Sequence, residues 1–178
     1  MIHVSLMLSD REVGIPAGAV VSLLGAGSTD WLRRIAGLPT PTVAAIVHRA
    51  HPDRPATALA LAPPVLLPWL TVAENIAYAL LLRQWPARHR QDAARHFAGV
   101  VGVSKHLNSA PAQVGTQVQQ RAAIARALAA DPEVLLLDQP SAVTDEEQWH
   151  RICREARARG QTVIGTGPLP AADMAIHI

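Results

Sequence analysis

Nearly continuous apolar runs alternate with amphipathic stretches along the chain. EVLLLD (133–138) and TVIGTG (162–167) are typical of strands that are buried on both faces of a parallel sheet. MIHVSLML (1–8) and GAVVSLLG (18–25) are short, rich in β-forming residues and separated by the turn residues GIPAG. We therefore expect a strand in each of these four segments.

Helical periodicity fills much of the sequence between the strands. We expect the first helix to begin at Thr29 or Asp30 as its N-cap, and the second at Thr71, with Glu74 completing a capping box. The five predicted helices cover TDWLRRIAGL (29–38), TVAENIAYALLLRQ (71–84), PARHRQDAARHFAGVVGV (86–103), VQQRAAIARALAADP (118–132) and DEEQWHRICREARARG (145–160).

Strands that alternate with helices predict an α/β fold with a mostly parallel sheet. Short strands with proline-rich connections are expected between 39 and 64, and helices interrupt the sheet around 71–130. A chain of 178 residues with 49% hydrophobic content can bury one sizeable core, so we predict a single domain over 1–178.

Composition narrows the functional classes. The formal charge is +2, and all basic residues except Lys105 are arginines without an accompanying aromatic stripe, so we expect no nucleic-acid partner. The single cysteine, Cys153, excludes an internal disulfide and is interpreted as an apolar helix position. Three prolines and Glu74 interrupt the longest apolar run (56–82), and no signal peptide is recognised, so we expect a cytoplasmic protein.

One long segment carries a family resemblance. QVQQRAAIARALAADPEVLLLDQPSAV (117–143) resembles the ATPase subunits of ABC transporters, where the signature helix leads into the Walker B strand. IPAGAVVSLLG (15–25), WLRRIAGL (31–38) and LLPWLTVAENIAYAL (66–80) fit the same family in the same order. The last of these is similar to the nitrate, sulfonate and taurine importer group, although the chain is shorter than such subunits usually are.

The resemblance implies a P-loop NTPase-like ABC nucleotide-binding domain. Its mostly parallel sheet would carry a trimmed N-terminal β-region and a helical subdomain at about 71–130. The family's phosphate loop has the pattern G-x-x-x-x-G-K-[ST], in which backbone N–H groups and the lysine surround phosphate. Here the loop is about three residues short and reads GAGSTD, so Gly25, Gly27, Ser28 and Thr29 stand without a lysine. Asp30 adds negative charge where phosphate would lie.

The other family motifs are altered as well. Asp138 keeps the Walker B carboxylate, but Gln139 stands where active members have the glutamate that polarises water. The Q-loop glutamine position holds Ala62, the signature Ser-Gly-Gly reads Gly-Thr-Gln at 115–117, and the switch histidine position holds Gly167. Asp138 is interpreted either as a Mg²⁺ ligand or, preferably, as an acceptor for loop amides.

Together these losses predict a vestigial nucleotide site at Gly25, Gly27, Ser28, Thr29, Asp138 and Gln139, with no catalytic residue and no resident metal. ATP with Mg²⁺ is expected to bind weakly if it binds. The favoured function is a degenerate, non-hydrolysing ABC-type domain that acts as a structural or regulatory subunit of a membrane transport complex. Two alternatives remain: a working ATP-binding subunit of an importer for small anions, and a soluble regulator or assembly factor outside transport.

The segment Leu66, Leu67, Pro68 and Trp69 is the candidate partner contact. The resemblance implies that it receives a segment of a membrane subunit, and the competing interpretation is a proline turn anchored in the core by Leu66, Leu67 and Trp69. Expected partners are another ABC ATPase subunit, a membrane permease or a second copy of the chain. The protein would then be peripheral on the inner face of the cell membrane through that partner.

Overall fold

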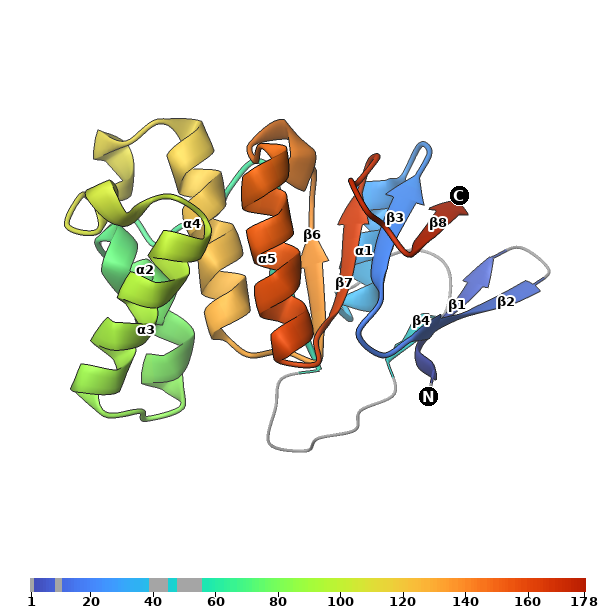
Figure 1. The fold of residues 1–178 in the computed structure, drawn as a ribbon, viewed down its shortest axis with the longest axis horizontal. Helices are drawn as coiled ribbons and strands as arrows, with labels where there is room; N and C mark the ends of the chain where they lie inside the picture. Colours follow the sequence, from blue (N-terminus) through green and yellow to red (C-terminus); the bar gives the residue numbers. More distant parts are fainter. Residues whose placement is uncertain (1, 9–10, 39–44, 48–55) are drawn as a thin grey trace.

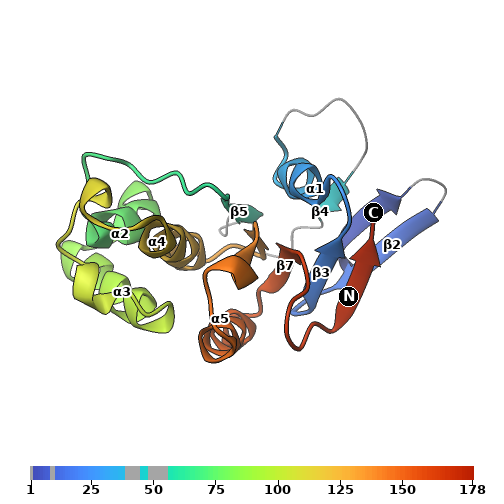
Figure 2. The ribbon, with the colours of Figure 1, turned by 90° about the horizontal axis from the view of Figure 1, so that it is seen from above.

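The computed structural model describes residues 2–8, 11–38, 45–47 and 56–178 (Figure 1). Part of the predicted strand region between 39 and 64 therefore lies outside the described residues. The described residues form two sheets with helices on both sides and a helical lobe at one end (Figures 1 and 2). This arrangement confirms the expected α/β class.

The larger sheet has five parallel strands. In spatial order they are β5 (Thr57–Ala60), β6 (Val134–Leu137), β7 (Thr162–Thr166), β3 (Val20–Leu24) and β8 (Met174–His177). All four neighbouring pairs are parallel, for example Val134 opposite Thr162 and Val20 opposite Val163. The expectation of a mostly parallel sheet is confirmed.

The smaller sheet is antiparallel, with the order β2 (Arg11–Pro16), β1 (Ile2–Leu8) and β4 (Ala45–Val47). It is the trimmed N-terminal β-region. The sequence did not predict β2 or β8, because each is short and has few fully buried apolar positions. Ile15 is the one fully enclosed side chain among those described in β2, and Ile176 is the only residue of β8 in the buried class.

The continuous apolar run in β6 has a simple structural reason. Leu135 and Leu137 belong to the core beneath the helical lobe, whereas Val134 and Leu136 belong to the core shared with β1, β3 and α1 (Ser28–Ile35). Successive side chains of a strand point to opposite faces, so a strand covered on both sides is apolar throughout. Figure 2 shows α1 on one face of the sheet and α5 (Glu146–Ala158) on the other.

The helical lobe consists of α2 (Val72–Leu82), α3 (Ala87–Val100) and α4 (Thr116–Ala129), joined by the short 3₁₀ turns η1 (Ser104–His106) and η2 (Pro111–Gln113). A third such turn, η3 (Pro140–Ala142), precedes α5. The lobe falls in the predicted range of 71–130.

All five predicted helices are present, with shifted ends. α3 ends at Val100, three residues early, and α4 begins at Thr116, two residues early. The predicted cap of α1 at Thr29 or Asp30 is wrong: the N-cap is Gly27, with a positive φ of 87°, so the helix starts two or three residues sooner. The predicted capping box of α2 is confirmed by the reciprocal bonds between Thr71 and Glu74.

Cys153 lies buried in α5, as the sequence suggested. Burial raises the pKa of its thiol to about 12, with the nearby Arg157 opposing the shift and Asp173 adding to it. The thiol is therefore protonated at neutral pH and acts as a small apolar side chain.

Candidate functional site

Asp138 follows β6 at the carboxyl edge of the parallel sheet, and its side chain is buried. Its Oδ1 atom accepts hydrogen bonds from the hydroxyls of Thr29 in α1 and Thr166 in β7, both at 2.9 Å. Its Oδ2 atom accepts the backbone N–H of Ala62 at 3.3 Å. One carboxylate thus joins the first turn of α1, the end of β7 and the segment after β5.

These contacts decide between the two interpretations of Asp138 in part. A loop amide does bond the carboxylate, as expected, but the two shorter bonds come from threonine hydroxyls that the sequence did not single out as its partners. Three donors therefore bond this buried carboxylate, as is usual for a buried polar group. The carboxylate is tied to three separate parts of the fold.

Thr166 was missed because its role depends on strand order. β7 lies directly beside β6, so the residue that ends β7 meets the residue that follows β6. Thr166 donates to Asp138 and accepts the backbone N–H of Gln139 at 2.8 Å. The available signal was a threonine at the end of one buried strand, β7, and an aspartate directly after the neighbouring strand, β6.

Gln139 lies beside the carboxylate but faces outward. Its backbone adopts a left-handed conformation with φ of 49° and ψ of 49°, and its side chain is exposed. Such a conformation is uncommon for a residue other than glycine, and the bond from its N–H to Thr166 helps to hold it. The amide is a negligible base, so the position offers no proton acceptor.

The loop between β3 and α1 contains only the three residues 25–27. Gly25 and Gly27 both have positive φ, 118° and 87°. A Cβ atom at Gly25 would lie 2.3 Å from the carbonyl oxygen of Ile178. The N–H of Ile178 donates to the carbonyl of Leu24 at 2.9 Å. The segment after β8 therefore packs against the loop, and one residue rather than four separates the glycines.

The order Gly27, Ser28, Thr29 corresponds to the G-K-[ST] end of a phosphate loop. Thr29 matches the motif's hydroxyl position because it meets Asp138, and Ser28 then occupies the lysine position with a short neutral side chain. Among the six predicted positions the structure brings Thr29 and Asp138 into contact and places Gln139 next to them. Gly25, Gly27 and Ser28 line the short turn that leads to Thr29.

The charged side chains at the start of α1 contact one another or a ring along the helix. Asp30 occupies the first turn and pairs with Arg33 at 3.2 Å, while the Arg34 guanidinium lies over the Trp31 ring at 5.1 Å. Both arginines are thus engaged along the helix. Lys105, the only lysine of the sequence, lies in η1 of the helical lobe.

The signature region begins α4. Gly115 is its N-cap with an ordinary φ of −66°, and Thr116 and Gln117 are exposed. Gln119 donates to the carbonyls of Val114 and Pro111 and fixes the turn before the helix. Gln120, also missed from sequence, is buried and donates to the backbone carbonyl of Asp138 at 3.1 Å, which connects α4 to the end of β6.

The predicted partner segment lies before α2. Leu66 is buried and Leu67 is half-buried, but Pro68 is exposed and 75% of Trp69 is exposed. The interpretation that Trp69 anchors the turn in the core is therefore wrong. Val65 is also 64% exposed, so two large apolar side chains of this segment face solvent.

A buried amide holds this segment in place. The Asn75 side chain accepts the N–H of Leu67 at 2.8 Å and donates to the carbonyls of Leu67, Leu70 and Thr71. Arg126 of α4 donates to the Val65 carbonyl, and burial lowers the pKa of this guanidinium. Trp69 is exposed on a backbone that is well supported.

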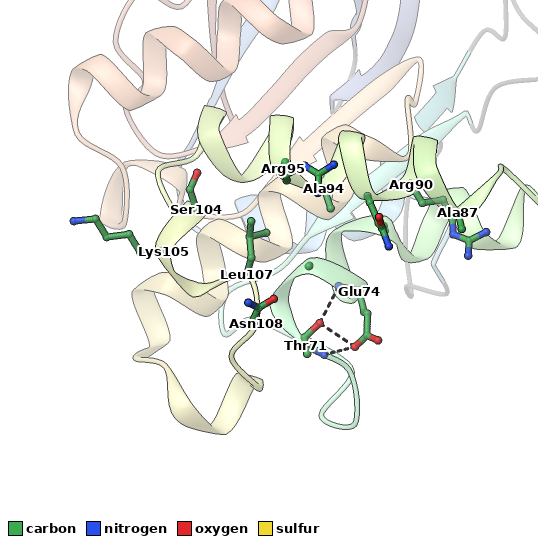
Figure 3. A pocket seen from close by; sticks show the side chains of 13 residues that line it. Thr71, Glu74, Ala87, Arg90, Ala94, Arg95, Ser104, Lys105, Leu107 and Asn108 are labelled. Carbon is green, nitrogen blue, oxygen red and sulfur yellow. Dashed lines mark hydrogen bonds between the residues drawn. The ribbon is translucent and has the colours of Figure 1, made fainter.

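A cavity of about 750 Å³ lies between α2, α3 and η1 (Figure 3). Its polar lining includes Glu74, Arg90, Arg95, Lys105 and Asn108. Figure 3 shows the capping box of Thr71 and Glu74 at its edge, where the Thr71 N–H and hydroxyl lower the pKa of Glu74. The cavity mixes both charges and contains no part of the Asp138 network.

Two kinds of feature are absent from the described ranges, a metal-binding cluster and a membrane-spanning helix. Within them no cluster of three or more His, Cys, Asp or Glu side chains is arranged to hold a metal ion. Nor does any helix found there have the length and apolar character required to cross a bilayer.

A parallel sheet in which the carboxylate after one strand meets a hydroxyl at the start of the helix after a glycine turn defines a P-loop type of α/β domain. A family model described as ABC transporter matches residues 8–142. The chain belongs to the ABC transporter family.

The similar proteins include several named importer components. The chain is 35% identical to the bicarbonate transport ATP-binding protein CmpC of Synechococcus elongatus, over 84% of this chain and 25% of that protein. It is 34% identical to the nitrate import ATP-binding protein NrtD of Synechocystis, over 82% of this chain and 57% of that protein. The taurine import ATP-binding protein TauB of Roseobacter denitrificans is 29% identical, over 88% of this chain and 62% of that protein.

The chain spans between about a quarter and three fifths of the length of these relatives. Among solved structures, the dimeric ATP-binding cassette MJ0796, in a post-hydrolysis state bound to ADP and Pi, superposes with a TM-score of 0.71. The match covers 93% of this chain and 84% of that one at 22% identity. It establishes the ABC ATPase fold.

Proposed function

We propose that this chain is a degenerate ABC-type ATPase domain that does not hydrolyse ATP and serves as a structural or regulatory subunit of a membrane transport complex. The observation that carries the proposal is the closed network at Asp138. Its carboxylate already accepts two hydroxyls and an amide, from three separate parts of the fold. A Mg²⁺ ion at Oδ1 would have to compete with the Thr29 and Thr166 hydroxyls.

The residues present do not fit Mg²⁺ and ATP. A phosphate needs converging N–H donors and a cation, whereas the turn has three residues, Ser28 replaces the lysine and Asp30 is negative. The segment ending at Ile178 packs against Gly25 and leaves no space there even for a methyl group. Water activation would need a base, and Gln139 provides none.

The proposed transport role rests on the exposed segment and on the relatives. Val65 and Trp69 present apolar surface on a backbone held by Asn75, as expected for a preformed contact with another protein. Similar proteins are named as import components for bicarbonate, nitrate and taurine. The partner is a membrane permease, and a second ATPase-type subunit would complete the pair.

A working ATP-binding subunit is the second candidate, and one observation favours it. The contact between Thr29 and Asp138 keeps together the two side chains that hold Mg²⁺ in the family's motif. A phosphate-release assay separates the candidates, using the chain and its Gln139→Glu variant, which restores the carboxylate. We expect release at the buffer background from both. Sustained release that Gln139→Glu accelerates would overturn the proposal.

The partner is tested by site-specific photo-crosslinking from position 69 in membranes. We expect a cross-link to an integral permease, and none from position 38, where Leu38 is also exposed at 46% but lies after α1. Cross-links only to soluble proteins would instead support a regulator outside transport.

A further inference from the structure

Exposed apolar side chains gather at the turn between α2 and α3. Leu81 is 47%, Leu82 67% and Trp85 41% exposed, and these are three of the six large apolar side chains exposed among the described residues. The turn forms one end of the helical lobe, at the lower left in Figure 1. We call residues 81–90 the α2–α3 turn.

Cationic groups surround this apolar surface. The Arg83 guanidinium lies 5.7 Å from the centre of the Trp85 ring, and the His89 ring meets Trp85 edge-on at 6.5 Å. Arg90 donates from Nη1 to the Trp85 carbonyl, and Arg88 is exposed beside it. The side chains that make these contacts with Trp85 are therefore basic or aromatic.

Acidic residues are missing from the same stretch of sequence. Residues 75–91 contain three arginines and no Asp, Glu or Lys, so their formal charge is +3 against +2 for the whole chain. Asp92, the next acidic residue, pairs with Arg95 at 2.6 Å. Between Glu74 and Asp92, three arginines without an acidic residue thus lie in the part of the sequence that also carries the exposed apolar side chains.

This combination fits one kind of surface. Tryptophan prefers the boundary between hydrocarbon and water, leucine side chains insert among acyl chains, and arginines reach lipid phosphates with their flexible stems. A turn at the end of the lobe can reach a flat, deformable layer with all of these side chains at once. The positive charge selects an anionic layer.

We propose that the α2–α3 turn binds the surface of an anionic lipid bilayer directly. Leu81, Leu82 and Trp85 lie in the headgroup region, and Arg83, Arg88 and Arg90 face the lipid phosphates. This contact concerns lipid rather than protein, and it stands whether or not the chain binds ATP or a permease.

Cosedimentation of the purified chain with vesicles tests the proposal. We expect binding to vesicles of phosphatidylserine with phosphatidylcholine that is at least about tenfold stronger than to phosphatidylcholine alone, and that weakens as salt is added. The double change Leu82→Ser with Trp85→Ser should lower binding about tenfold or more, because apolar insertion is lost. Arg88→Glu should lower it about tenfold through charge alone.

Trp69→Ser is the matched control, since it removes a more exposed tryptophan from the other end of α2. Its vesicle binding should equal that of the unaltered chain, and circular dichroism should show that every variant is folded. Equal binding to both kinds of vesicle, or undiminished binding by the double variant, would overturn the proposal. Loss of a dimer in the double variant, without vesicle binding by the unaltered chain, would assign the turn to a second copy instead.

Discussion

The side chains at the carboxyl edge of the parallel sheet and those on the helical lobe differ in their exposure to solvent. At the carboxyl edge of β6, the acidic group that would face a ligand is buried and bonded to three protein donors. On the helical lobe, Trp69 and the α2–α3 turn expose apolar surface that nothing within the described chain covers. In the proposed function, the first region is a closed nucleotide site and the second a set of contact surfaces.

The largest effect is expected when the buried Asp138 carboxylate is removed. Asp138→Ala leaves the hydroxyls of Thr29 and Thr166 and the N–H of Ala62 without their acceptor, so we expect the free energy of unfolding to fall by about 3 kcal/mol. Urea unfolding measures it. Asp145→Ala removes only the N-cap of α5 and should cost about 1 kcal/mol. Equal losses in the two variants would mean that the network is not closed.

The second prediction concerns the support beneath the exposed segment. Asn75→Ala removes the side-chain acceptor of the Leu67 N–H and the side-chain donor to the carbonyls of Leu67, Leu70 and Thr71, and should lower the free energy of unfolding by about 2 kcal/mol. Hydrogen exchange should show faster exchange of the Leu67 amide. Unchanged exchange there would contradict the supporting role, and Tyr78→Phe on the same helix is the control.

The third prediction uses pH. The Val20 N–H lowers the pKa of Asp173 against the opposing effect of burial, and Arg157 lowers it further. A lowered folded-state pKa stabilises the protein above the ordinary value of 3.8, and the stabilisation is lost as pH falls through the folded value. Because the side chain is half exposed, the effect should stay below about 1 kcal/mol.

Urea unfolding of the chain and of Asp173→Asn measures this effect across pH. The difference between the two should be constant above about pH 5 and shrink below about pH 4. A difference that grows on acidification would show that the sign is wrong.

The smallest effect on stability is expected at the exposed surface. Trp69→Ser should change the free energy of unfolding by no more than about 0.5 kcal/mol, because 75% of the side chain is already in water. The same change should also abolish cross-linking to the permease from a photo-reactive residue at position 65, since Val65 is likewise exposed. A loss of stability comparable to that of Asn75→Ala would mean that Trp69 supports the core after all.

The sequence predicted the parallel strands β3, β6 and β7 and all five helices because their signals are local. The run VLLL in β6 is apolar at every position because its two faces lie in two different cores. Thr71 and Glu74 form a capping box, a pattern that indicates a helix start by itself. β2 and β8 escaped detection because their stability comes from neighbours in the sheet rather than from their own pattern.

The site was predicted only in part for a similar reason. Motif order identified Thr29, Asp138 and Ala62 as positions to compare, but no spacing revealed that all three meet. Thr166 and Gln120 reach Asp138 through strand order and helix packing, which act over 28 and 18 residues of sequence. The exposure of Trp69 was equally out of reach, because a leucine-rich turn looks the same in sequence whether its tryptophan faces in or out.

Titration with Mg-ATP by calorimetry, paired with thermal unfolding, tests most directly whether the nucleotide site is closed. We predict no heat of binding and no change in Tm for the unaltered chain, and the same for Thr29→Val, which removes one donor to Asp138. A stabilisation of about 2.7 kcal/mol at a hundredfold excess over Kd, lost in Thr29→Val, would contradict the account and show a working nucleotide site.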